Sequence, residues 1–339
     1  KRTGLLPLLH QIPSIQSRDQ RTYRTLIIDM EKLAHFIHHI SLWREKHISH
    51  QNFVLLLSLV IGIISAMAAI ILKDLVFYTS DFLHSSFSPE EFNYLYLIFP
   101  AVGITLTVLF VKYVIKANIS HGISRILLAI SKNKGQIDSH NTWSSLVAST
   151  LTVGFGGSVG LEAPIVYTGS AIGSNVGRLF KLDTRSIILL IACGSTGAFA
   201  AIFKAPIAAI VFAIEVLMVD LTTASLMPLL VASVAGTSLS FFLLGKSVMF
   251  SYTVSSDFQL QNIPLYIALG IFSGAVSVYF LKASGYIETL IKKIKKIYVR
   301  IIIGGTILSL LIFLFPILYG EGYDTLKAIL NGKGEELLF

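Results

Sequence analysis

Charged residues are scarce in this sequence. Asp, Glu, Lys and Arg together make up 14% of its 339 residues, whereas about 25% is typical of a soluble globular domain. A chain with so little charge, 54% hydrophobic residues and a mean hydropathy of +0.73 cannot cover a soluble particle with polar surface. The length alone would suggest roughly two soluble domains, but the composition predicts one helical bundle in a membrane.

Cysteine and metal-ligand patterns are also sparse. The single cysteine, Cys193, lies in an apolar stretch, which excludes an intrachain disulfide and favours a packed thiol. The nine histidines gather towards the N-terminus without metal-ligand spacing, and no His-Glu-x-x-His motif occurs. We therefore expect no metal, no other cofactor and no enzymatic activity.

The positive charge is spread between the apolar runs. The net charge is +8, and because the cations flank apolar segments they indicate membrane topology rather than nucleic-acid binding. Residues 53–76 and 95–114 are each long enough to cross a hydrocarbon core of about 30 Å. The intervening residues 78–94 contain no Lys or Arg, whereas residues 112–134 contain five. The positive-inside rule therefore predicts a cytoplasmic N-terminus, and we expect a multi-pass plasma-membrane protein.

The apolar segments become short and interrupted after residue 120. Short, broken helices at membrane depth are tolerated where the backbone lines a cavity or is buried in protein. In transporters such half-helices direct their N-terminal amides at anionic cargo, although kinked helices of ordinary packing are the alternative. The segments fall at residues 122–131, 141–155, 162–179, 185–202, 206–218 and 222–244.

The pattern of the first half restarts near residue 263. Two short sequences recur, and the loop charges give this second copy the opposite direction, as in the inverted repeats of transport folds. The pairs are Gly62-Ile63-Ile64-Ser65 with Gly270-Ile271-Phe272-Ser273, and His121-Gly122-Ile123-Ser124 with Glu321-Gly322-Tyr323-Asp324. We expect a cytoplasmic tail and interfacial helix at 1–50, a first transmembrane repeat at 51–245, and the start of the second repeat at 263–339.

Glu162 is the first candidate for function. It lies between two apolar segments, after a glycine-rich break and just before Pro164, which suits the first turn of a helix. The nearby amides of a helix start are free to donate, so a carboxylate there occupies the positive helix end until an anion displaces it or a proton releases it. An intramembrane carboxylate is a functional hypothesis; the alternative is a helix-end charge at a water interface.

Residues 160–164, Gly-Leu-Glu-Ala-Pro, resemble the Gly-Arg-Glu-Gly-Pro motif of the CLC family of chloride channels and chloride/proton antiporters. Residues 200–215 resemble the family's Phe-Asn-Ala-Pro-Leu-Ala-Gly helix, which ends in Ile-Glu, and the resemblance extends over residues 50–335. It implies a CLC-like bundle of tilted and broken helices in two inverted repeats, of which the second is incomplete here. It also implies a homodimer in a lipid bilayer that carries chloride or a similar small anion.

The resemblance also implies site residues. Glu162 matches the gating glutamate, and His121 falls where the family has an anion-coordinating Ser. Either an N–H of His121 donates to the anion, or its ring points away and only the backbone amides after it contribute. The predicted anion-binding residues are His121, Gly122, Ile123, Gly160, Leu161 and Ala163.

Two positions bear on coupling to protons. Glu215 matches a glutamate of the second motif and is the candidate for a proton pathway, but Val216 replaces the usual inner Glu and cannot relay a proton. We therefore expect a glutamate-gated chloride pathway that is channel-like or weakly proton-coupled. The alternatives are a proton-coupled antiporter of chloride, fluoride or nitrate, a cation-coupled transporter using Glu162 and Glu215, and an enzyme using His121, His140 or Ser158.

Overall fold

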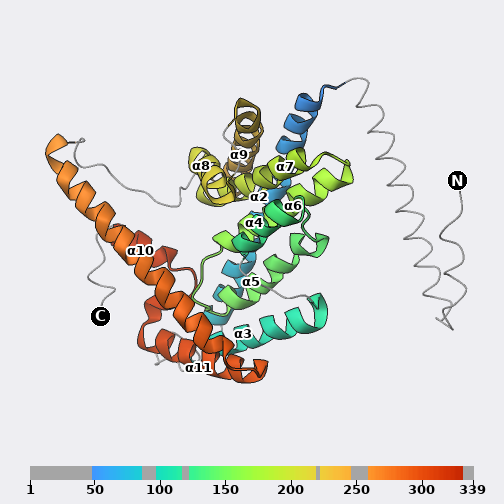
Figure 1. The fold of residues 1–339 in the computed structure, drawn as a ribbon. Helices are drawn as coiled ribbons and strands as arrows, with labels where there is room; N and C mark the ends of the chain where they lie inside the picture. Colours follow the sequence, from blue (N-terminus) through green and yellow to red (C-terminus); the bar gives the residue numbers. More distant parts are fainter. Residues whose placement is uncertain (1–47, 86–96, 117–121, 219–221, 246–258, 331–339) are drawn as a thin grey trace, which may run out of the picture.

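The protein is described by a computed structural model that covers residues 48–85, 97–116, 122–218, 222–245 and 259–330 (Figure 1). Within these ranges the chain is helical and has no β-strand, so the prediction of an all-α architecture is confirmed. The helices are α2 (His50–Ser85), α3 (Phe99–Phe110), α4 (Gly122–Lys132), α5 (Ser144–Gly154), α6 (Glu162–Leu179), α7 (Thr184–Phe203), α8 (Pro206–Leu217), α9 (Thr223–Leu244), α10 (Ile263–Lys292), α11 (Ile297–Leu314) and α12 (Tyr323–Leu330). Single turns of other helix types lie at Val111–Ile115, Ser139–Thr142, Leu260–Asn262 and Pro316–Leu318.

Long and short apolar helices are both present, as the sequence predicts, but the predicted crossing at residues 95–114 is one of the shorter ones, because its helix begins only at Phe99. Among the described residues, five segments are long and apolar enough to cross a membrane: His50–Leu83, Thr184–Phe203, Ala224–Leu244, Leu260–Lys292 and Ile297–Leu314. Three apolar helices are shorter: Phe99–Ile115, Ser144–Gly154 and Pro206–Leu217. This mixture means that several helix ends lie at membrane depth, where their backbone groups need partners within the protein.

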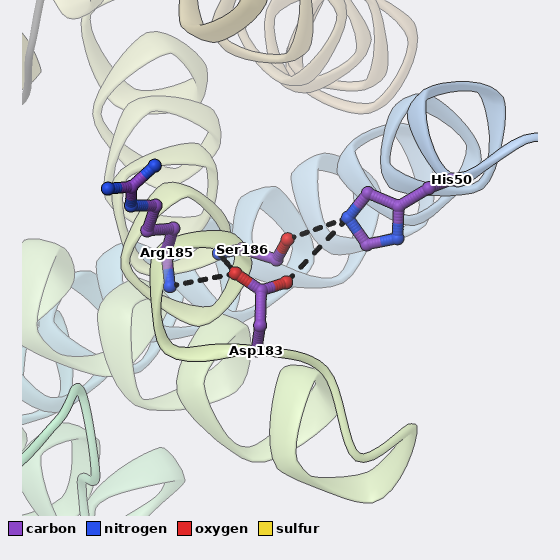
Figure 2. A network of polar contacts seen from close by, with 4 residues as sticks. All are labelled: His50, Asp183, Arg185 and Ser186. Carbon is purple, nitrogen blue, oxygen red and sulfur yellow. Dashed lines mark hydrogen bonds and ion pairs between the residues drawn. The ribbon is translucent and has the colours of Figure 1, made fainter.

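The start of α7 is fixed by a polar network that also holds the start of α2 (Figure 2). Asp183 caps α7, because its carboxylate accepts hydrogen bonds from the backbone N–H groups of Arg185 at 3.2 Å and Ser186 at 3.3 Å. Nε2 of His50 lies 2.9 Å from the hydroxyl of Ser186 and 3.7 Å from the carboxylate of Asp183. The two helices therefore begin at the same side of the bundle.

Helix α7 runs through the middle of the first half and packs against α2, α6 and α9 (Figure 1). Small residues allow these backbones to come close. A Cβ added to Gly197 would lie 2.7 Å from the Cα of Gly62 in α2, and one added to Gly194 would lie 2.7 Å from the carbonyl carbon of Gly169 in α6. Close packing of small residues is the main source of helix association inside a membrane, so these glycines hold the half that carries Glu162.

Helices α10 to α12, which we call the loosely packed half, pack less closely than helices α2 to α9, which we call the closely packed half. No residue of α10 is buried, and in Figure 1 this helix (orange) extends along one side of the molecule. Helix α11 packs on α3, where a Cβ added to Gly305 would lie 3.2 Å from the Cβ of Ala101. The division into a tail and two repeats remains a prediction, and residues 1–47 and 331–339 lie outside the described residues.

Candidate functional site

Helix α6 begins at Glu162, the position that the sequence predicts. The residue before it, Leu161, is buried and provides no side-chain cap for the first-turn amides. Pro164 lies in the same turn and has no N–H, and the first helical hydrogen bond runs from the amide of Ile165 to the carbonyl of Leu161. The helix therefore presents an uncapped, positive end, with the acidic side chain of Glu162 as the charge next to it.

The carboxylate of Glu162 is held by contacts from two parts of the chain. The hydroxyl of Tyr323, the first residue of α12, donates a hydrogen bond to Oε1 of Glu162. Oε2 folds back over Gly160 and occupies the space that a Cβ at residue 160 would need. The ring of Tyr323 packs edge-on against Phe203 at the end of α7, with ring centroids 6.1 Å apart. A larger residue at 160 would force the carboxylate out of its present position.

A cavity opens beside Glu162 on the side of α2 and α12. A narrow gap around the carboxylate is lined by Lys73, Leu161, Ile165, Ile202, Phe203, Glu321 and Tyr323. Lys73, Glu321 and Tyr323 also line the adjoining cavity of about 340 Å³. We call this larger space the α2–α12 cavity; its other lining residues are Val76, Phe77, Ser80, Val153, Tyr319, Gly320, Gly322, Thr325 and Lys327.

A second cavity, of about 190 Å³, touches the same first turn of α6 through Ala163 and Pro164. We call it the α4–α5 cavity. Gly122, at the start of α4, lines it, and a Cβ added there would lie 3.2 Å from the carbonyl oxygen of Ala163. The structure thus brings together the starts of α4 and α6, two of the predicted anion-binding segments. The remaining lining is largely polar or small: Ile115, Arg125, His140, Asn141, Ser144, Ser145, Ala148, Ser149 and Tyr167.

The other predicted residues are placed as follows. His121 lies outside the described residues, and Ile123 is partly buried in the first turn of α4. Glu215 is exposed near the end of α8, and it does not line the two cavities described above. Val216 is partly buried and packs against the main apolar core. The structure thus groups Gly122, Gly160, Leu161, Glu162 and Ala163, but not Glu215.

Several lining residues were not predicted from the sequence. Lys73 had a usable signal, because it is the only Lys or Arg in the 36 residues of α2, and ionisable residues within apolar helices are rarely incidental. The sequence gives no signal for Tyr323, because it lies 161 positions along the chain from Glu162, which it contacts. Arg125 is one of the five cations in residues 112–134 that predict the membrane topology, and it also lines the α4–α5 cavity.

Residues 156–160, Gly-Gly-Ser-Val-Gly, have the spacing of the Gly-x-Ser-x-Gly motif of hydrolases. That motif places its serine on a sharp turn between a strand and a helix. Ser158 is instead exposed in a loop between two helices, α5 and α6, and no strand occurs in the described part of the chain. The geometry therefore does not support a nucleophilic role for Ser158.

The sequence of this chain is similar to those of several known proteins. An uncharacterized protein of Methanocaldococcus jannaschii is 25% identical over 271 residues, which cover 79% of this chain and 65% of that protein. A voltage-gated ClC-type chloride channel, ClcB, of Escherichia coli is 26% identical over 206 residues, 58% of this chain and 47% of that protein. This chain therefore spans less than two thirds of the length of either relative.

Two solved structures share the fold. A CLC-type fluoride/proton antiporter superposes with a TM-score of 0.71 at 28% identity, covering 82% of this chain and 69% of the other. A slow cyanobacterial Cl⁻/H⁺ antiporter has a TM-score of 0.70 at 21% identity, covering 81% and 67%. The profile of the family described as voltage gated chloride channel matches residues 102–339. The chain belongs to this CLC family, and its fold is that of an integral membrane protein.

Proposed function

We propose that this protein carries small anions, chloride among them, across a membrane along a pathway that passes the first turn of α6. The observation that carries the proposal is the position of Glu162. Its carboxylate lies beside the uncapped start of α6, with the α2–α12 cavity reached from one side of that turn and the α4–α5 cavity from the other. A helix end between two cavities is an arrangement that suits an anion pathway.

Glu162 acts in this proposal as the gate. While ionised, its carboxylate occupies the position where the first-turn amides of α6 would otherwise attract an anion. An anion that arrives in sufficient concentration competes for that position, and a proton removes the charge that holds the carboxylate there. Anion flux should therefore rise as the pH falls and as the anion concentration rises.

Around the gate, the backbone of Gly122, Ile123, Gly160, Leu161 and Ala163 supplies the polar groups that replace the hydration of the anion. The approach of Gly122 to the Ala163 carbonyl supports this grouping, because it places the start of α4 next to the start of α6. The starts of two helices, of which that of α6 has no side-chain cap, then lie in one region, the arrangement that suits an anion at membrane depth.

We further propose that transport is channel-like or only weakly coupled to protons. Val216 packs in the apolar core and cannot pass a proton onward, and Glu215 is exposed away from Glu162. A chloride/proton or fluoride/proton antiporter is the second candidate, favoured by the likeness to a CLC-type fluoride/proton antiporter at 28% identity.

Assembly and orientation belong to the same proposal. Large apolar side chains on α8 and α9 are exposed, among them Ile207, Val211 and Phe242, which is compatible with contact between two copies that each hold their own pathway. The cytoplasmic N-terminus and the plasma membrane follow from the loop charges alone.

The test is reconstitution of the purified chain into liposomes loaded with chloride. Chloride efflux well above that of protein-free liposomes is expected, and efflux equal to theirs would contradict the proposal. A pH electrode in the same experiment decides the coupling: an outward chloride gradient should move few protons. Stoichiometric proton movement against a proton gradient would instead establish the antiporter. Repeating the efflux with fluoride and nitrate determines the anion preference.

A further inference from the structure

One face of α2 points its side chains into the α2–α12 cavity. Lys73, Val76, Phe77 and Ser80 all line this space, and their spacing of three and four residues places them on one side of a helix. Of these four residues, only Lys73 also lines the gap around Glu162. Lys73 therefore lines both the larger cavity and the gap at the gate.

The charges of the two spaces differ in sign. The larger cavity is lined by the ammonium groups of Lys73 and Lys327 and by one carboxylate, that of Glu321. The gap at the gate is lined by two carboxylates, Glu162 and Glu321, with Lys73 as its cation. An anion is thus stabilised in the larger cavity while the ionised gate still repels it.

In the described part of the chain the side chain of Lys73 makes no hydrogen bond and no ion pair within 4.0 Å, although Glu162 and Glu321 line the same gap. It is partly buried in a long apolar helix. A cation in such surroundings is costly unless it pairs with an anion. Residue 161, next to the gate, is a buried leucine and adds no charge.

A second cation lies within reach of the charge on Lys73. Lys204, which ends α7 in the left-handed conformation at φ 51°, donates a hydrogen bond from Nζ to the carbonyl of Gly245. The pKa of Lys204 is lowered, first by desolvation and then by the positive charge of Lys73. The charge of Lys73 thus acts on a second cation, Lys204, although Lys204 lines neither the gap nor the α2–α12 cavity.

We propose that the α2–α12 cavity is an anion-binding site, with Lys73 as its principal ligand. A small inorganic anion binds there before it displaces the carboxylate of Glu162. The proposal rests on the function proposed above and extends it, because it assigns a separate binding site in front of the gate. Its hydroxyl and ammonium lining, from Ser80, Thr325 and Lys327 besides Lys73, suits a partly hydrated halide.

The test is chloride titration of the purified full-length chain by calorimetry, together with chloride uptake into liposomes. Lys73→Gln removes the charge and keeps a similar length, and we expect the chloride concentration for half-saturation to rise roughly tenfold. Lys73→Arg should stay close to wild type. Lys282→Gln, on the exposed α10, is the matched control and should change nothing. Added gluconate should shrink the difference between Lys73→Gln and wild type, since salt screens the charge.

The outcomes separate this inference from the proposed function. If the wild type shows no chloride flux, the proposed function fails and the site falls with it. If the wild type transports chloride and Lys73→Gln keeps its half-saturating concentration, only the role of Lys73 is overturned. Size-exclusion chromatography checks that each variant is folded, and Lys73→Met provides the same comparison if Lys73→Gln aggregates, because it also removes the charge at a similar length.

Discussion

Helices α7 and α10 are both long and apolar, with mean hydropathies of 2.1 and 1.8 over their most apolar windows, but their surroundings differ. In α7, 78% of that window is buried inside the protein, whereas in α10 none of it is. Gly194 in α7 touches the backbone of α6, while around Gly274 in α10 the described residues leave open space. Hydropathy thus identifies a helix that can cross a membrane, and close backbone contact identifies one that supports a site.

The same difference shows which part of the fold positions Glu162. Glu162 starts α6, which packs along α7, so its position is fixed by the closely packed half. The loosely packed half reaches the site through one short element, α12, whose Tyr323 donates a hydrogen bond to Glu162. The packed half therefore builds the helix end, and the other half contributes a hydrogen bond to its carboxylate.

The largest effect should come from breaking the close contact in α7. Gly194→Val would push a side chain into the backbone of Gly169, and overpacking of this kind costs about 3 kcal/mol. We expect loss of monodisperse protein, or a large fall in the thermal unfolding midpoint. Gly274→Val is the matched control in α10, where a Cβ meets no described atom within 4 Å, and its midpoint should stay near wild type. Equal effects of the two variants would remove the distinction between the halves.

The next effect concerns the contact that joins the halves. Tyr323→Phe removes the hydrogen bond to Glu162 and keeps the ring against Phe203. A hydrogen bond to a charged group contributes about 1.5–3 kcal/mol, so the carboxylate should leave its position more readily. We expect chloride efflux at neutral pH to rise by at least about tenfold. Tyr279→Phe, exposed on α10, is the control. Identical efflux in both variants would exclude Tyr323 from gating.

The smallest effect is expected at the polar network of Figure 2. Hydrogen bonds from Ser186 lower the pKa of Asp183, against a smaller opposing effect of desolvation. A lowered pKa in the folded state means that the stabilisation is present above the unfolded pKa and is lost as the pH falls through the folded one. Asp183→Ala should cost about 1 kcal/mol as a lost helix cap, seen as a lower unfolding midpoint at neutral pH. In acid the gap to wild type should narrow, because a protonated Asp183 keeps only the cap that a neutral oxygen provides.

A gap between Asp183→Ala and wild type that stays as large in acid as at neutral pH would contradict this assignment. Asp183→Asn is the control, because its side-chain oxygen still caps the helix. It should lie between the alanine variant and wild type at neutral pH.

The sequence was sufficient for features that depend on local pattern. The start of α6 at Glu162 follows from a glycine-rich break and a proline in the first turn, and the short helices follow from the spacing of glycine and proline. The contact of Tyr323 with Glu162 could not be predicted, because nothing local to either residue records a partner 161 positions away. The near-complete exposure of α10 was also out of reach, since its apolar composition matches that of buried helices.

The most direct test of the central claim is the pH dependence of chloride efflux in wild type and Glu162→Gln. Glutamine keeps the shape of the side chain and removes the charge that competes with the anion. We predict that wild-type efflux from liposomes rises as the pH falls, and that Glu162→Gln shows high efflux at neutral pH that hardly changes in acid. If the variant keeps the wild-type rate and pH dependence, Glu162 is not the gate.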